Sequence, residues 1–144
     1  MQSVLRTGLA GFALAGFVAL GVPALAEEMK FTAELTGASE VPPVETEATG
    51  SADVTYDTES KELSWTVEHS GLSGDVTAAH FHGPAAEGEN APPVVPIEIA
   101  DLAEGSATLD DTQAASLTDG MLYLNLHTAA NPDGEIRGQV MAAE

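Results

Sequence analysis

Residues 78–84 read Ala78-Ala79-His80-Phe81-His82-Gly83-Pro84, and they place two of the chain's four histidines two positions apart. The stretch belongs to an expected strand over 76–82. Side chains at positions i and i+2 of a strand project from the same face, with Cα atoms about 6–7 Å apart. Two imidazoles at this spacing can converge on one metal ion. The rest of the sequence is therefore considered as the scaffold of a candidate metal site.

A third histidine, His127, ends a second strand-like stretch over 121–127. Every second residue of that stretch is a leucine: Leu122, Leu124 and Leu126. His127 consequently shares the opposite face with Tyr123 and Asn125, just as His80 and His82 lie opposite Ala79 and Phe81. All three histidines are predicted to point away from the apolar rows, on the outside or at the rim of a β-sandwich. We predict that His80, His82 and His127 ligate one metal ion.

The donor set favours a late transition metal. Three neutral imidazoles suit zinc, copper or nickel, and the chain has no cysteine that could supply a thiolate. Copper is expected because Cu(II) has the highest intrinsic affinity at nitrogen-rich sites, with zinc as the alternative. We also expect the surrounding carboxylates to raise the pKa values of these histidines in the metal-free protein.

Two further residues are weighed as additional ligands. His69 continues the apolar row of the strand 62–69, and a hydrogen-bonded histidine at the edge of the core is favoured there over a ligand. Glu68 lies on the polar face of the same strand, which is expected to form a hairpin with 76–82. Glu68 is thus a candidate fourth ligand, although a solvated glutamate is favoured.

The remaining sequence alternates apolar and polar residues in short runs punctuated by turn residues, which is typical of an all-β protein. Eight strands are predicted, at 30–35, 51–56, 62–69, 76–82, 94–99, 106–109, 121–127 and 135–141. Pro96 makes the fifth of them an edge candidate, because proline cannot donate a ladder hydrogen bond. One short helix is predicted over 111–117, with Asp110 or Asp111 as its N-cap and Gly120 beyond its end.

Residues 1–26 have the features of a secretory signal peptide. Arg6 supplies a positive n-region, 9–22 is apolar or glycine throughout, and Ala24-Leu25-Ala26 is an A-x-A cleavage site. A membrane anchor is the alternative, but the apolar run is short for a span. The mature chain is predicted to be a single domain over 27–144, periplasmic or secreted and not held in a membrane.

The mature chain is strongly acidic. It keeps all 23 acidic residues but only Lys30, Lys61 and Arg137 as basic ones, so its formal charge is −20 with neutral histidines. This charge argues against nucleic acids and anionic membrane surfaces as partners, and it raises the local concentration of cations. The absence of cysteine excludes a disulfide.

Three separate motifs resemble a chordin-type (CHRD) domain. They are Phe31-Thr32-Ala33-Glu34-Leu35-Thr36-Gly37-Ala38-Ser39-Glu40-Val41-Pro42-Pro43, Ala79-His80-Phe81-His82-Gly83-Pro84-Ala85, and the stretch 122–140. This domain occurs in the extracellular regulator chordin and in many exported microbial proteins. The resemblance implies a Greek-key β-sandwich or barrel. His69 lies outside the three motifs.

A more distant likeness is to Cu,Zn superoxide dismutase, which also binds copper with an H-x-H strand and a later histidine. On that resemblance Arg137 would match the arginine that guides the anion. The departures are the missing cysteines and the absence of a zinc-binding histidine in 83–93. They speak against dismutase activity and leave copper binding.

Three functions remain open at this point. The first is an exported, non-enzymatic protein of copper binding and handling. The second is a copper-only, superoxide dismutase-like enzyme, which is less favoured. The third is a non-catalytic extracellular interaction module, in which His127 hydrogen-bonds backbone near the turn 131–134 while His80 and His82 cap the loop 83–93.

Overall fold

Alternating side chains build the strands of this protein, as β1 (Glu28–Thr36) illustrates: Phe31, Ala33 and Leu35 are buried and the residues between them are exposed. The computed structural model describes residues 16, 20–22 and 25–144. The signal peptide predicted over 1–26 lies largely outside the described residues. Among the residues described, no helix combines the length and apolarity needed to cross a membrane.

Nine strands, one α-helix and two short 3-10 helices follow one another in residues 25–144. Their bounds are β1 (Glu28–Thr36), η1 (Gly37–Ser39), β2 (Thr49–Asp57), β3 (Glu62–Ser70), β4 (Val76–His82), β5 (Pro93–Ile97), η2 (Ile99–Asp101), β6 (Glu104–Thr108), α1 (Asp111–Thr118), β7 (Tyr123–Thr128), β8 (Ile136–Gln139) and β9 (Met141–Ala142). Each of the eight predicted strands is present. The last of them is divided at Val140 into β8 and β9.

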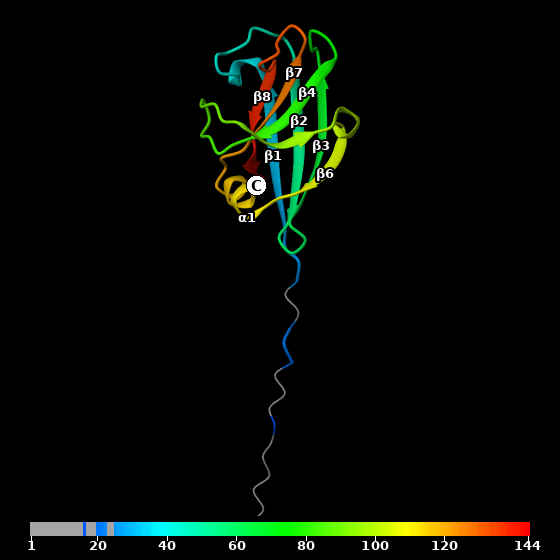
Figure 1. The fold of residues 1–144 in the computed structure, drawn as a ribbon, viewed down its shortest axis with the longest axis vertical. Helices are drawn as coiled ribbons and strands as arrows, with labels where there is room; N and C mark the ends of the chain where they lie inside the picture. The colour runs from blue at the N-terminus through cyan, green and yellow to red at the C-terminus, as the bar shows by residue number, and fades with distance from the viewer. Residues whose placement is uncertain (1–15, 17–19, 23–24) are drawn as a thin grey trace, which may run out of the picture.

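The strands form one antiparallel sheet in the order β5-β4-β7-β8-β1-β2-β3-β6, with β9 paired to β1. The sheet curls into a nearly closed barrel (Figure 1). The prediction of a single all-β Greek-key sandwich or barrel with one short helix is confirmed. The edge prediction for 94–99 is also confirmed, because β5 is the outermost strand beside β4.

The predicted hairpin between 62–69 and 76–82 is wrong. β3 pairs with β2 on one side and β6 on the other, while β4 pairs with β5 and β7. A strand has only two edges, and both edges of β3 are taken. The loop 71–75 therefore carries the chain from one end of the strand order to the other.

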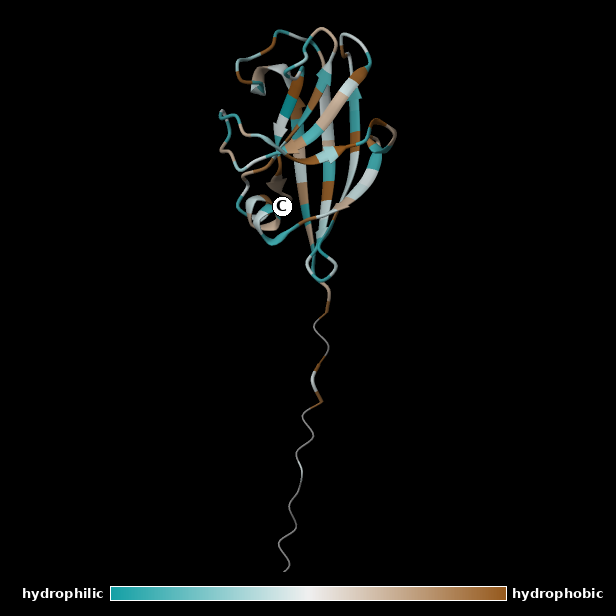
Figure 2. Ribbon diagram, in the orientation of Figure 1, coloured by the Kyte–Doolittle hydropathy of each residue, from teal (hydrophilic) through white to brown (hydrophobic). Residues whose placement is uncertain are grey.

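The core fills the inside of the barrel. Leu35, Leu63, Phe81, Leu124 and Ile136 are fully buried, and apolar and polar residues alternate along the strands (Figure 2). The Trp65 and Phe81 rings pack in a T-shaped arrangement with 5.5 Å between their centroids. Phe81 on β4 therefore joins the core, which turns its neighbours His80 and His82 outward.

The helix α1 begins at Asp111 as predicted and ends at Thr118, one residue beyond the predicted end. The Asp110 side chain accepts a hydrogen bond from Gln113 N, and the Gln113 side chain accepts one from Asp110 N, which makes a capping box. Gly120 follows the helix with φ of 70°, a conformation that favours glycine. Leu117 is fully buried, so the helix contributes to the core through its last turn.

Candidate metal centre

The three histidines of the predicted site lie together on the outer face of β4 and β7. Ala78 on β4 pairs with His127 on β7, and His80 pairs with Asn125. The ring centroids are 5.4 Å apart for His80 and His82, 5.2 Å for His80 and His127, and 6.2 Å for His82 and His127. One nitrogen of each ring lies within 4.8 Å of the others, so the group could hold a metal ion.

Backbone carbonyls define the tautomers of two of these rings. His82 Nδ1 donates to the carbonyl oxygen of Ala91 at 2.9 Å, and His127 Nδ1 donates to that of Pro132 at 2.8 Å. A carbonyl oxygen only accepts, so each neutral ring carries its proton on Nδ1 and a lone pair on Nε2. Metal-ligating histidines commonly donate their second ring N–H to such a partner.

The distance between the His80 and His127 rings is suited to a shared metal ion. His80 Nδ1 lies 3.3 Å from His127 Nε2 and donates to its lone pair in the metal-free protein. Two nitrogens bound at about 2.0 Å to one tetrahedral ion would be about 3.3 Å apart. His82 Nε2 is buried and has no hydrogen-bond partner. An unpaired lone pair of this kind is costly, and a bound cation would satisfy it.

Burial lowers the pKa of both strand β4 histidines below the ordinary value of 6.5. For His80, burial acts together with the nearby His127 ring. For His82, burial outweighs the hydrogen bond to Ala91, and His80, His127 and Arg137 lower the pKa further. The prediction that surrounding carboxylates would raise these pKa values is wrong, because burial and cationic neighbours act on these rings instead. Both rings are neutral at pH 7, the form that binds metals.

Loops cover the outer face that was expected to be open. Every residue of β7 is buried, and the exposed fraction of His127 is only 9%. The segment 83–92 and the segment around Glu40 pack over this face through side-chain contacts with β7 and β8. His80 and His82 are half-buried. The candidate site thus lies at the edge of a layer of polar side chains between the strands and the loops that cover them.

Arg137 lies inside this layer. Its exposed fraction is 5%, its Nε donates to Glu40 Oε2 at 3.2 Å, and its guanidinium stacks over the Tyr123 ring at 4.0 Å. The His82 ring is also stacked on the Tyr123 ring, with 4.8 Å between the two ring centroids. These contacts make Arg137 a structural member of the site's surroundings, and an anion-guiding role stays a prediction.

Sequence reasoning missed the partners of this layer. Glu40 is buried and accepts hydrogen bonds from Asn125 Nδ2 at 2.8 Å and from Arg137. Burial raises the Glu40 pKa, and the contacts with Asn125 and Arg137 oppose that rise. Two signals could have found these residues: Glu40 lies within the first family-like motif, and Tyr123 and Asn125 share the His127 face.

A second buried carboxylate, Glu135, supports the strand that carries His127. It accepts hydrogen bonds from the hydroxyls of Thr46 at 2.8 Å, Ser73 at 2.6 Å and Thr128 at 2.7 Å, and from Ser73 N. Burial alone would raise its pKa, but these hydrogen bonds outweigh burial and lower the pKa to about 2. Glu135 is therefore an ionised anchor for two loops beside the site.

The two additional candidate ligands lie elsewhere. His69 and Glu68 are both exposed near the end of β3. Because β3 pairs with β2 and β6, the hairpin that suggested Glu68 as a ligand does not form. Neither residue belongs to the histidine cluster. The exposed position of His69 also differs from the predicted hydrogen-bonded histidine at the edge of the core.

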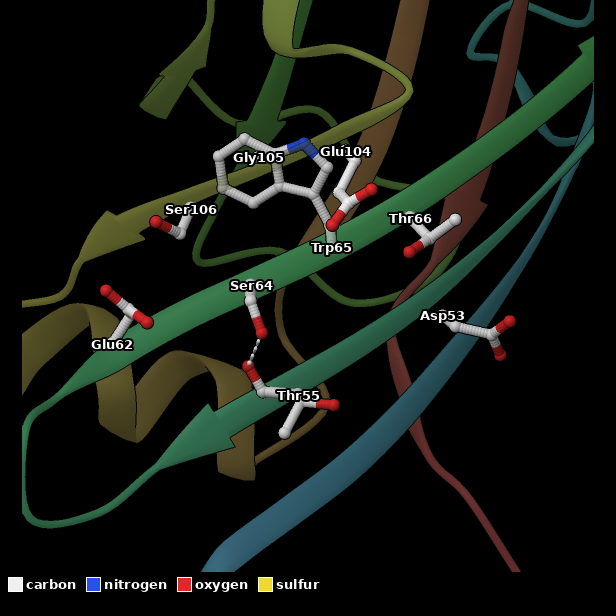
Figure 3. A pocket seen from close by; sticks show the side chains of 9 residues that line it. All are labelled: Asp53, Thr55, Glu62, Ser64, Trp65, Thr66, Glu104, Gly105 and Ser106. Carbon is white, nitrogen blue, oxygen red and sulfur yellow. Dashed lines mark hydrogen bonds between the residues drawn. The ribbon is translucent and has the colours of Figure 1, made fainter.

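A separate hollow of about 570 Å³ lies over β2, β3 and β6 (Figure 3). It is lined by Asp53, Glu62, Glu104 and neutral polar residues, together with Trp65. Figure 3 shows the three carboxylates spread around the hollow and not turned toward one point. It contains no histidine, so it is not a second imidazole site.

Comparison with known proteins identifies one family. Residues 31–140 match the family model described as CHRD domain. No curated protein matches the chain, and no solved structure matches it. The match covers all three histidines of the cluster together with Glu40, Tyr123 and Arg137.

Proposed function

We propose that this chain, which belongs to the CHRD domain family, is an exported protein that binds one copper ion through His80, His82 and His127. Its role would be copper handling, by sequestration, buffering or delivery to a partner in the periplasm or outside the cell. The observation that carries the proposal is the buried, unpartnered Nε2 of His82 beside two further imidazoles. Such an arrangement costs stability in the metal-free protein and is relieved by a cation.

The donor chemistry supports copper over other metals. The cluster has three neutral nitrogen donors and contains no carboxylate and no thiolate. Intrinsic affinity at nitrogen donors rises to Cu(II) and falls again at Zn(II), so zinc is the weaker alternative. The acidic surface raises the local concentration of cations around the site.

Two contacts also suit the non-catalytic interaction module. His127 donates to the Pro132 carbonyl, within the turn 131–134, and His82 donates to the loop residue Ala91. In that function the histidines would only hold loops. The dismutase-like function has less support, because the Arg137 side chain donates to Glu40, Glu89 and Asn90 and is not free to attract an anion.

The test is a titration of the mature chain 27–144 with Cu(II) and with Zn(II), alongside His80→Ala and His127→Ala. His69→Ala is the matched control, because His69 is exposed and outside the cluster. We expect one equivalent of copper to bind wild type and His69→Ala equally, and both cluster variants to bind much more weakly. Equal binding by all four proteins would show that the site is wrong.

An activity assay separates the enzymatic alternative from copper handling. Superoxide consumption by the copper-loaded protein is compared with that by the same amount of free copper. Copper handling predicts no excess rate over free copper, whereas a dismutase-like enzyme requires one.

A further inference from the structure

The orientation of the His82 ring depends on a loop. His82 ends β4, and the hydrogen bond that defines its tautomer goes to the carbonyl of Ala91, in the segment 83–92 that connects β4 to β5. This segment has no regular secondary structure of its own. The Nε2 lone pair therefore keeps its direction only if something holds the Ala91 carbonyl in place.

Tyr123 holds both backbone polar groups of Ala91. The Tyr123 hydroxyl donates to the Ala91 carbonyl at 3.1 Å and accepts from Ala91 N at 3.2 Å. Tyr123 is also the cross-strand partner of His82, and the two rings are stacked with an interplanar angle of 6°. One side chain thus contacts His82 directly through its ring face and indirectly through Ala91.

Arg137 holds the same loop from the other face of Tyr123. Its guanidinium lies 4.0 Å from the centre of the Tyr123 ring, while Nη1 donates to the Glu89 carbonyl at 3.0 Å and Nη2 to Asn90 Oδ1 at 2.7 Å. The residues Glu89 and Asn90 immediately precede Ala91. The ring and the loop are consequently fixed relative to each other by one buried cation.

We propose that Tyr123, supported by Arg137, is a positioning residue that holds His82 as its Nδ1–H tautomer with the Nε2 lone pair free for the metal. The inference rests on the proposed function, because it assigns a role in preparing that site. Tyr123 is not one of the three proposed ligands. It acts through the Ala91 carbonyl and through the stack on His82, as outer-shell partners of metal ligands do.

The experiment reads the tautomer directly in the metal-free mature chain labelled with ¹⁵N-histidine. Long-range ¹H–¹⁵N spectra near pH 8 distinguish a proton on Nδ1 from one on Nε2 in each ring. Tyr123→Phe keeps the stacked ring and removes the hydroxyl. Tyr56→Phe is the matched control, because Tyr56 is the only other tyrosine and lies in the core of β2.

In wild type and Tyr56→Phe we expect His82 to carry its proton on Nδ1. In Tyr123→Phe we expect His82 to populate both tautomers, while His127, whose partner is Pro132, keeps the Nδ1 proton as an internal control. Copper affinity should fall about tenfold or more in Tyr123→Phe, as for other outer-shell changes, and stay within twofold in Tyr56→Phe. Arg137→Lys is the second variant, and it should also mix the His82 tautomers.

An unchanged His82 tautomer in both Tyr123→Phe and Arg137→Lys would overturn the inference. A wild-type His82 with its proton on Nε2 would also overturn it. The tautomer spectra need no metal, so a protein that binds no copper would refute the proposed function while this inference is still decided by the spectra.

Discussion

Glu135→Gln tests how much the hydrogen bonds of the buried Glu135 carboxylate, next to the site, contribute to the stability of the fold. The carboxylate is fully buried and accepts hydrogen bonds from Thr46, Ser73 and Thr128. Glutamine keeps the shape but replaces one accepting oxygen by an amide that donates. A hydrogen bond to a charged group is worth about 1.5–3 kcal/mol. The hydroxyls can turn to accept from the new amide, so we expect a net loss of about 3 kcal/mol.

The loss of stability in Glu135→Gln should depend on pH in one direction. The Glu135 pKa is about 2 in the folded protein, against 4.5 ordinarily. A carboxyl group whose pKa is lowered by folding contributes stability above its unfolded pKa and loses that contribution as the pH falls toward the folded pKa. The stability gap between wild type and Glu135→Gln should therefore be full at neutral pH and shrink between pH 4.5 and 2.

The assay is denaturant unfolding of metal-free protein at a series of pH values. At neutral pH a loss of about 3 kcal/mol corresponds to a fall of roughly 10 °C in the thermal midpoint for a domain of this size. Glu68→Gln is the control, because Glu68 is exposed on β3 and its change should stay within about 0.5 kcal/mol. A loss below about 1 kcal/mol, or a gap that does not shrink in acid, would refute the reasoning.

Three further predictions concern the histidines and the layer beside them. His80 and His82 should titrate below pH 6.5 in metal-free protein, measured by NMR, because burial lowers their pKa values. The histidines of the unfolded chain therefore take up protons at a higher pH than those of the folded protein, so the stability of the metal-free protein should fall as the pH drops below 6.5. Copper affinity should fall over the same range, because protons compete with the ion for the imidazoles. An affinity that is flat to about pH 4.5 would instead place the ion on surface carboxylates. Arg137→Met should destabilise the protein by about 3–5 kcal/mol in denaturant unfolding at pH 7, because it leaves Glu40 buried without its cation. Adding Glu40→Gln should recover part of that loss, and no recovery would contradict the pairing. Copper at about a hundredfold above its Kd should stabilise the protein by about 2.7 kcal/mol in thermal unfolding. A chelator should reverse that gain and His127→Ala should lack it, whereas a midpoint insensitive to both would favour the interaction module.

The positions of the strands and of the helix were predictable because their signals are local. A period of two places Phe31, Ala33 and Leu35 on one face whatever the rest of the chain does. The Asp110 and Gln113 capping box likewise involves residues three apart. Strand order is different, since each strand edge is filled by whichever partner buries it best. The short loop 71–75 indicated a hairpin between the strands on either side of it, but β3 pairs with β2 and β6 instead.

The convergence of His80, His82 and His127 was also predictable, from strand spacing and from the face that each residue occupies. Their electrostatic environment was not. The acidic composition predicted raised pKa values, but burial lowers the pKa values of His80 and His82. The signal peptide, the domain start at residue 27 and export stay predictions from the N-terminal sequence.

The sequence by itself determined which residue types could meet, because alternation along a strand follows from backbone geometry. Only the tertiary structure decided what surrounds them. Glu40 meets Arg137 across 97 positions of chain, and the carbonyls that orient His82 and His127 come from loop residues Ala91 and Pro132. A backbone carbonyl has no signature in the sequence, since every residue has one. Its position exists only once the barrel has closed and the loops have packed over β7.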